Sequence, residues 1–208
     1  MEKKSNCFDA IVSLIKQKFS DQCGIVYCNQ RKDTADVVYH LRRAGINAVF
    51  FHAGMDIHSK QASVDSWKSG EAHVICATVA FGMGIDKSNV TFVIHHSMPK
   101  DLESYVQESG RAGRDGNSAH CYILFRFEDR TKHLRNICCL PESDRKHVAL
   151  DGLNNIVKYC ITPVCLKQQI VTYFDNEASS SSIYNKHCDV CILNKNVEPV
   201  ECSEVAKG

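Results

Sequence analysis

The sequence contains no long hydrophobic run. Although 44% of its 208 residues are hydrophobic, no stretch approaches the roughly 18 to 20 apolar residues that are needed to span a bilayer. The opening segment MEKKSNCFDA also lacks the apolar core of a secretory signal peptide. We therefore expect an intracellular protein without a membrane partner, and the length allows one ordinary domain with a small appendage.

The chain also has almost no net charge. Its 25 basic and 24 acidic residues leave a formal charge of +1, which excludes a global positive field that would attract nucleic acid. Any contact with DNA would have to come from a local patch of basic side chains. Composition alone therefore argues neither for nor against DNA binding.

Cysteine, by contrast, is abundant, with 12 residues. A reducing compartment disfavours disulfides and leaves burial, metal binding or catalysis as roles for these thiols. Those that lie in apolar runs are expected to be core residues. This set comprises Cys23, Cys28, Cys76, Cys121, Cys138 and Cys139.

Short apolar runs alternate with amphipathic stretches between residues 6 and 127. Two of these stretches, residues 32–45 and 55–70, have helical spacing and end in glycine. The alternation predicts an α/β fold with a parallel sheet, helices on both faces, and ligands beyond the carboxyl ends of the strands. The runs expected to be strands are residues 24–28, 48–52, 73–77, 90–96 and 121–125.

The pattern changes to longer amphipathic segments near residues 126–130. We therefore predict a first domain over residues 1–127 and a small helical module over residues 128–194. Residues 195–208 are polar and without periodicity, so we expect a disordered tail.

Two arginines follow a polar, helix-like segment in YVQESGRAGRDG. Arg111 and Arg114 are each preceded by glycine, which lets the backbone turn sharply and approach a ligand. Guanidinium groups suit phosphate oxygens because they offer paired, permanently charged donors. Taken alone, the pattern also fits two surface arginines on a solvated loop.

Four segments together resemble the motor motifs of RecQ-family DNA helicases. They are ATVAFGMGIDK, YVQESGRAGRDG, GIVYC and FHAGM, and they occur in the order that the family has. The chain is most similar to the eukaryotic group, over about residues 9–191. The resemblance implies a second RecA-like lobe and a RecQ-type zinc-binding subdomain. It further implies that the chain is the C-terminal motor half of an ATP-dependent 3′-to-5′ DNA helicase, which acts in the nucleus on single-stranded and forked DNA.

The resemblance also implies a nucleotide site shared with a first RecA-like lobe, which would hold most of the ATP and Mg²⁺. Arg114 would reach the γ-phosphate across the cleft, with Arg111 as its partner and Gln107 at the same interface. An arginine of this kind contributes about 10³ to 10⁵ in rate in nucleotide hydrolases. Asp86 and Gly84 would lie near the nucleotide.

Other motif positions would contact DNA. The resemblance places Thr78 on the phosphate backbone, and it puts His52, Gly54 and the polar loop that begins at Asn29 along the DNA track. For His52 the alternative is a histidine that is simply hydrogen-bonded at a strand end. For residues 77–87, the alternative to a functional loop is a glycine-rich connection that caps a strand.

The zinc-binding pattern is incomplete. RecQ proteins hold Zn²⁺ with one cysteine at the start of a helix and three in a later loop. Tyr184 and Asn185 stand where one of the loop cysteines is expected, so His187 or Cys160 would have to complete the shell, or zinc binding is weakened or lost. The three matching positions are Cys165, Cys188 and Cys191.

The sequence contains neither a GxxxxGKS/T phosphate loop nor an acidic Mg²⁺ motif. The chain is therefore expected to be part of a motor that does not hydrolyse ATP alone. The alternative function is a non-catalytic nucleic-acid-binding or regulatory fragment. An unrelated flavodoxin-like enzyme would require both long motif matches to be accidental.

Overall fold

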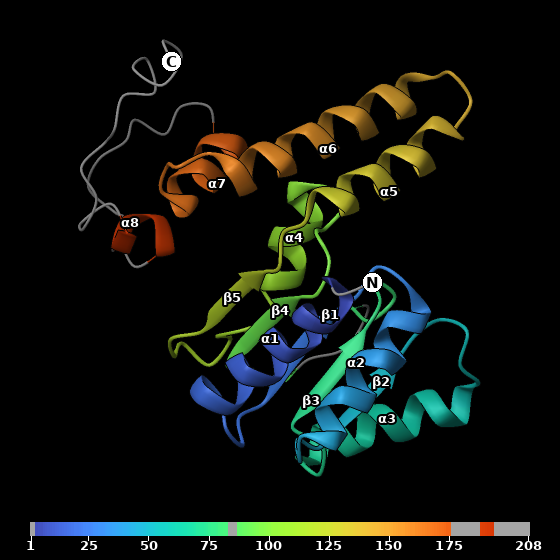
Figure 1. Cartoon of the computed structure of the whole chain (residues 1–208), viewed down its shortest axis with the longest axis vertical. Coiled ribbons are helices and arrows are strands. Elements are labelled where there is room, and N and C mark those ends of the chain that lie inside the picture. The colour runs from blue at the N-terminus through green and yellow to red at the C-terminus, as the bar shows by residue number, and fades with distance from the viewer. Residues whose placement is uncertain (1–2, 83–86, 176–187, 194–208) are drawn as a thin grey trace. The chain divides into compact units, whose positions relative to one another are not determined.

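The structure of the chain, a computed structural model, describes residues 3–82, 87–175 and 188–193 (Figure 1). The chain divides into two compact units, Met1–Ile156 and Val157–Gly208. Within the described residues, no helix combines the length and the apolar character that crossing a membrane requires. The predicted disordered segment 195–208 lies outside the described residues.

The first unit is built on a five-stranded sheet in which every pair of neighbouring strands is parallel. The strand order is β2-β3-β1-β4-β5, so the chain crosses over between strands as the βαβ rhythm predicts. The predicted α/β fold is confirmed. The strands are β1 (Gly24–Tyr27), β2 (Ala48–Phe51), β3 (Val74–Ala77), β4 (Phe92–His95) and β5 (His120–Ile123).

Helices cover both faces of this sheet. Residues of α1 and α2 pack on one face, together with strand residues such as Val26 and Cys76. On the other face, Trp67 of α3 packs against strand residues such as Ile25 and Tyr27. Successive strand residues alternate between the two clusters because side chains of a strand point to opposite faces in turn. The helices of this unit are α1 (Lys3–Lys18), α2 (Arg31–Arg43), α3 (Ile57–Ser69), α4 (Leu102–Ser109), α5 (Phe127–Cys138) and most of α6 (Asp144–Ile161).

Local sequence signals set the ends of α3. The Asp56 carboxylate accepts a 2.9 Å hydrogen bond from the Ser59 backbone N–H and caps the first turn. Gly70 ends the helix in the left-handed conformation, with φ of 88°. Lys87 donates from Nζ to the carbonyls of Trp67 and Lys68 in the last turn, so a cation also stabilises the negative end of the helix.

The glycine of GIVYC has a packing role. A Cβ atom at Gly24 would overlap the ring of Phe92 on the neighbouring strand β4. The missing side chain lets that ring lie directly over the backbone of β1, where Phe92 is fully buried.

The prediction that cysteines in apolar runs are core residues is partly wrong. Cys28 and Cys76 are buried, but Cys121, Cys138 and Cys139 are exposed. Cys121 lies on β5, which is an edge strand with a neighbour on one side only, and the last two lie where α5 ends. An apolar run therefore does not imply burial at the periphery of the fold.

The second unit contains the last turn of α6 and two short helices. These are α7 (Leu166–Phe174) and α8 (Asp189–Leu193). Cys165 occupies the residue before α7, and Cys188 the residue before α8. Both helix starts thus carry a thiol.

Candidate functional site

The predicted DNA-contacting residues follow the carboxyl ends of the strands, whereas the predicted arginines lie in the segment after α4. Because the strands are parallel, the loops after β1, β2, β3 and β4 leave the sheet at one edge. Backbone hydrogen bonds tie these loops to the sheet. The N–H of Thr78 donates to Phe51 over 3.2 Å, and the N–H of His96 donates to Tyr27 over 2.9 Å. The edge is therefore well ordered where the predicted site residues begin.

Arg111 is anchored to the loop that follows β3. Its Nη2 donates a 2.8 Å hydrogen bond to the carbonyl of Gly82. A Cβ atom at Gly82 would stand 2.5 Å from the same Nη2, which is too close for any side chain. Gly82 thus leaves room for the guanidinium to approach the backbone, and the half-buried Arg111 joins the two long motifs.

Arg114 lies three residues after Arg111 and is exposed. Its Nε donates to the carbonyl of Gly110 over 3.4 Å. Gly113 has φ of 71°, a conformation that side chains rarely adopt, and it turns the chain between the two arginines. Both arginines line one small recess, together with Ile25, Trp67, Phe81, Lys87 and Val90.

The other residues near the predicted nucleotide site are Gln107, Asp86 and Gly84. Gln107 lies on α4 and is exposed. Asp86 and Gly84 lie outside the described residues. Lys87 follows them in the sequence. Its Nζ donates to the last turn of α3 and lies 4.9 Å from the centre of the Trp67 ring, so this lysine stabilises the end of α3.

A buried polar cluster that the sequence analysis missed lies beneath the arginine segment. Glu108 of α4 and His95 of β4 are joined by a 2.8 Å hydrogen bond, and both are buried. The His95 ring stacks on Tyr27, with ring centres 5.4 Å apart. The Tyr27 hydroxyl in turn donates to the carbonyl of Phe81 over 3.1 Å. The available signal was that β1 and β4 end in Tyr and His, whereas their interiors are apolar.

Two of the predicted DNA-contacting residues lie at the ends of strands β2 and β3. Thr78 is buried, with 8% of its surface exposed. The Nδ1 atom of His52 is buried and meets no hydrogen-bond partner among the described residues. A buried polar atom without a partner is costly, so His52 is a group with an unused hydrogen-bonding capacity at this edge.

The loop after β1 meets the loop after β2 through Arg31. A Cβ atom at Gly54 would lie 2.7 Å from Nη1 of Arg31, so the glycine makes room for the guanidinium. Asn29 is differently engaged, because its Nδ2 donates to the carbonyl of Met98 over 3.0 Å. The same Nδ2 lies 3.1 Å from Nε2 of His133. Asn29 therefore ties its loop to the segment after β4, and Arg31 is the cation that this loop presents.

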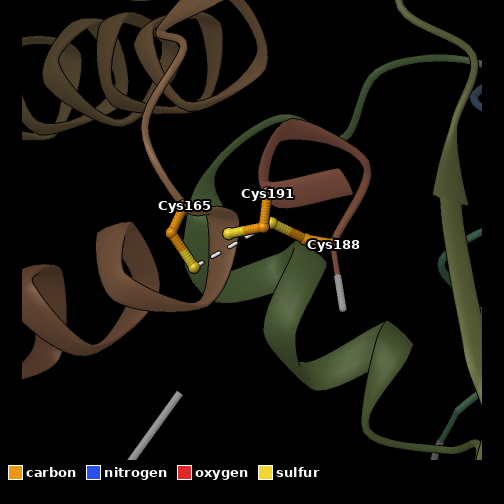
Figure 2. Close-up of side chains that lie close together, drawn as sticks. All are labelled: Cys165, Cys188 and Cys191. Atoms are coloured by element: carbon orange, nitrogen blue, oxygen red, sulfur yellow. Dashed lines mark hydrogen bonds between the residues drawn. The ribbon is translucent and has the colours of Figure 1, made fainter. Parts of the chain in front are cut away.

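Three cysteines converge in the second unit. The Sγ atoms of Cys165, Cys188 and Cys191 all lie within 4.8 Å of one another, and Figure 2 shows them pointing to a common centre. The Sγ atoms of Cys188 and Cys165 are 3.9 Å apart. Two thiolates on a tetrahedral zinc ion, each about 2.3 Å from the metal, would be about 3.8 Å apart. The spacing therefore fits Zn²⁺.

Cys160, one of the two predicted fourth ligands, does not join this group. Burial raises the pKa of the Cys160 thiol to about 12. His187 lies outside the described residues. Burial also opposes ionisation of Cys188, but hydrogen bonds from the backbone of Cys191 and Leu166 outweigh it and lower its pKa. The Cys188 thiol therefore loses its proton more readily than an ordinary cysteine.

Comparison with known families matches both parts of the chain. Residues 6–116 match the helicase conserved C-terminal domain, and residues 127–192 match the RecQ zinc-binding domain. The chain is 41% identical to a putative ATP-dependent DNA helicase Q1 of Caenorhabditis briggsae, over 98% of this chain and 32% of that protein. It is 36% identical to the ATP-dependent helicase SGS1 of Saccharomyces cerevisiae, over 99% of this chain and 14% of that protein. The chain thus spans a third or less of these relatives.

Solved structures show the same fold. The Escherichia coli DEAD-box protein SrmB, in complex with regulator of ribonuclease activity A, has a TM-score of 0.56 at 24% identity, covering 66% of this chain and 81% of that chain. A DEAD box protein of Methanococcus jannaschii has a TM-score of 0.54 at 28% identity, covering 64% of this chain and 36% of that one. The first unit therefore has the architecture of a helicase lobe.

Proposed function

Because the chain belongs to the RecQ family of helicases, we propose that it is the C-terminal motor half of an ATP-dependent 3′-to-5′ DNA helicase. The observation that carries this proposal is the convergence of Arg111 and Arg114 on one recess, which Trp67, Phe81 and Lys87 also line. Paired guanidinium groups suit the phosphate oxygens of a nucleotide, because they offer permanently charged donors.

The two arginines have different parts in the proposed mechanism. Arg114 is exposed and extends to the γ-phosphate of an ATP molecule bound to a first lobe. There it stabilises the charge that develops on the transferred phosphoryl group. Arg111 is bound to Gly82, so it fixes the arginine segment against the neighbouring loop. Gln107 faces the same interface, and Asp86 and Gly84 contact the nucleotide from that loop.

The first lobe is a required partner in this proposal. The sequence has no GxxxxGKS/T segment, and a motor of this kind needs such a loop to cradle the phosphates and position Mg²⁺. The chain alone therefore binds no catalytic ATP–Mg²⁺ complex. It becomes active when the first lobe closes on Arg111 and Arg114.

The DNA track is proposed to follow the carboxyl ends of β1, β2 and β3. We assign the phosphate backbone of single-stranded or forked DNA to Thr78, His52 and Gly54, with Asn29 supporting the track. The unused Nδ1 of His52 and the Arg31 guanidinium over Gly54 support this assignment. A phosphate oxygen accepts hydrogen bonds from both kinds of group. The family relationship to eukaryotic helicases such as SGS1 supports a nuclear location.

The cysteine cluster is proposed to hold a structural zinc ion. Cys165, Cys188 and Cys191 supply three thiolates, and one further donor such as His187 completes the site. When bound, the ion links the starts of α7 and α8, and in small metal sites of this kind binding and folding are coupled.

The decisive experiment joins this chain to the first lobe of the Caenorhabditis briggsae relative. DNA-stimulated ATP hydrolysis should appear in the joined protein, and Arg114→Ala should abolish it while leaving the melting temperature unchanged. Joined protein that is folded, binds DNA and hydrolyses no ATP would instead favour the second candidate, a non-catalytic nucleic-acid-binding fragment. The absence of a phosphate loop from the sequence is the observation that favours this candidate.

A further inference from the structure

A continuous set of buried contacts connects Glu108 to the loop after β3. Glu108 accepts a hydrogen bond from Nε2 of His95, since a carboxylate can only accept. His95 stacks on Tyr27, its partner in the register of β4 and β1. Tyr27 then donates its hydroxyl hydrogen to the carbonyl of Phe81, which precedes Gly82.

The set closes on itself through Arg111. Its side chain binds the carbonyl of Gly82, and its backbone N–H donates to the carbonyl of Glu108 over 3.4 Å. Burial raises the pKa of Tyr27, while the charge of Arg111 and a hydrogen bond from it act in the opposite direction. Tyr27 and Arg111 are thus in direct electrostatic contact, and the Tyr27 hydroxyl stays protonated as a donor to Phe81.

These polar groups stand where apolar residues would pack without cost. His95 is 1% exposed and Tyr27 is 3% exposed. The Nδ1 atom of His95 is buried and has no hydrogen-bond partner among the described residues. Burying polar groups destabilises a fold unless they are paired, whereas a connected polar network selects a single arrangement of its members. This network lies next to the arginine segment, so a single arrangement of its members would also fix the position of that segment.

We infer that Tyr27, His95 and Glu108 are positioning residues, which set Arg111 against Gly82 and thereby tie the arginine segment to the loop after β3. For its catalytic consequence, this inference rests on the proposed function. A shift of the loop after β3 moves Phe81 and Gly82, and the network transmits that shift to the segment that carries Arg114. DNA contact at the loop after β3 is thereby coupled to nucleotide contact at the arginine segment.

The test uses Tyr27→Phe, which keeps the ring and its stacking on His95 and removes only the hydroxyl. Tyr39→Phe is the matched control, because Tyr39 is 57% exposed. In the whole chain joined to a first lobe, Tyr27→Phe should lower kcat for DNA-stimulated hydrolysis about fivefold, the effect of one hydrogen bond. KM for ATP should be nearly unchanged, and the melting temperature should fall by only about 2 to 4 °C, because the Phe81 carbonyl loses one donor. The control should have normal kcat.

A double-mutant cycle then separates positioning from a general structural role. In an Arg111→Ala background, Tyr27→Phe should have no further effect, because both changes break the same connection. Glu108→Gln should behave in the same way. If Tyr27→Phe still lowers kcat fivefold in that background, or has no effect in the parent, the inference is wrong although the helicase function stands.

A second readout does not depend on hydrolysis. Trp67 is the single tryptophan of the chain, its ring meets Phe81 edge-on at 5.6 Å, and it lines the same recess as Arg111. Its emission in the chain alone should change alike in Tyr27→Phe and Arg111→Ala, and it should not change in Tyr39→Phe. Unchanged emission in the first two variants overturns the link itself. A joined protein without hydrolysis but with these emission changes would overturn only the proposed function.

Discussion

Arg111 and Gly82 are 29 positions apart in the sequence and are joined by a 2.8 Å hydrogen bond from Nη2 to the backbone carbonyl. A Cβ atom at Gly82 would stand 2.5 Å from the guanidinium, so any other residue there would require the Arg111 side chain to shift. The hydrogen bond connects the segment that carries Arg114 to the loop after β3. The absence of a side chain at Gly82 therefore favours this contact between the two motifs.

Gly82→Ala should displace the Arg111 side chain and disturb the arginine segment. In the chain joined to a first lobe, we expect DNA-stimulated hydrolysis to fall roughly tenfold or more, because a small misplacement of a catalytic group is costly in rate. The neighbouring variant Val79→Ala, at a side chain that is 65% exposed, should hydrolyse ATP at the parent rate. Equal rates for Gly82→Ala and the parent would show that this contact has no role in catalysis.

Arg114→Lys should be nearly as harmful as Arg114→Ala. Lysine keeps the charge but loses the planar, paired donors that suit a phosphoryl group, so we expect a loss of about 10³-fold or more in kcat. Arg135→Ala, in the last turn of α5, is the control and should be silent. Measurements of hydrolysis at saturating ATP and DNA decide the matter, and a lysine variant with the parent kcat would contradict the assigned role.

Lys87→Met should affect stability and leave nucleotide chemistry intact. Loss of the hydrogen bonds from Nζ to the last turn of α3 should lower the free energy of unfolding by about 2 kcal/mol. Urea unfolding followed by Trp67 fluorescence measures this change. The rate of hydrolysis per folded molecule should equal that of the parent, and a selective loss of kcat would place Lys87 at the nucleotide instead.

Metal content tests the cysteine cluster. Purified chain should contain about one zinc ion per molecule, and Cys188→Ser should release it and destabilise the second unit because binding and folding are coupled. Cys138→Ser, at an exposed cysteine outside the cluster, should retain the metal. A parent protein without zinc would remove the site.

Tyr184→Cys tests the missing ligand. Tyr184 lies outside the described residues, and it stands in the sequence where a fourth cysteine is expected. A fourth thiolate would complete a closed tetrahedral shell, so the variant should retain zinc against a chelator at concentrations that strip the parent. Equal retention would indicate that the parent already has four good ligands.

Short-range features of this protein could be predicted from the sequence. Apolar runs identified all five strands of the sheet, and the glycine that ends the predicted 55–70 helix, Gly70, does end α3. These signals are local, since periodicity reports which side of an element is buried and capping depends on residues within one turn. The same reasoning was wrong for Cys121, because a run of apolar letters does not reveal that a strand lies at the edge.

The sequence by itself determined the elements, their parallel arrangement and the three thiols that can meet a metal ion. Only the tertiary structure decided that Arg111 binds Gly82, that Tyr27 and His95 stack above Glu108, and that Cys160 is absent from the cluster. Such pairings depend on the strand order β2-β3-β1-β4-β5, which places distant segments side by side. Local periodicity has no information on that order, because each element has the same pattern whichever neighbour it receives.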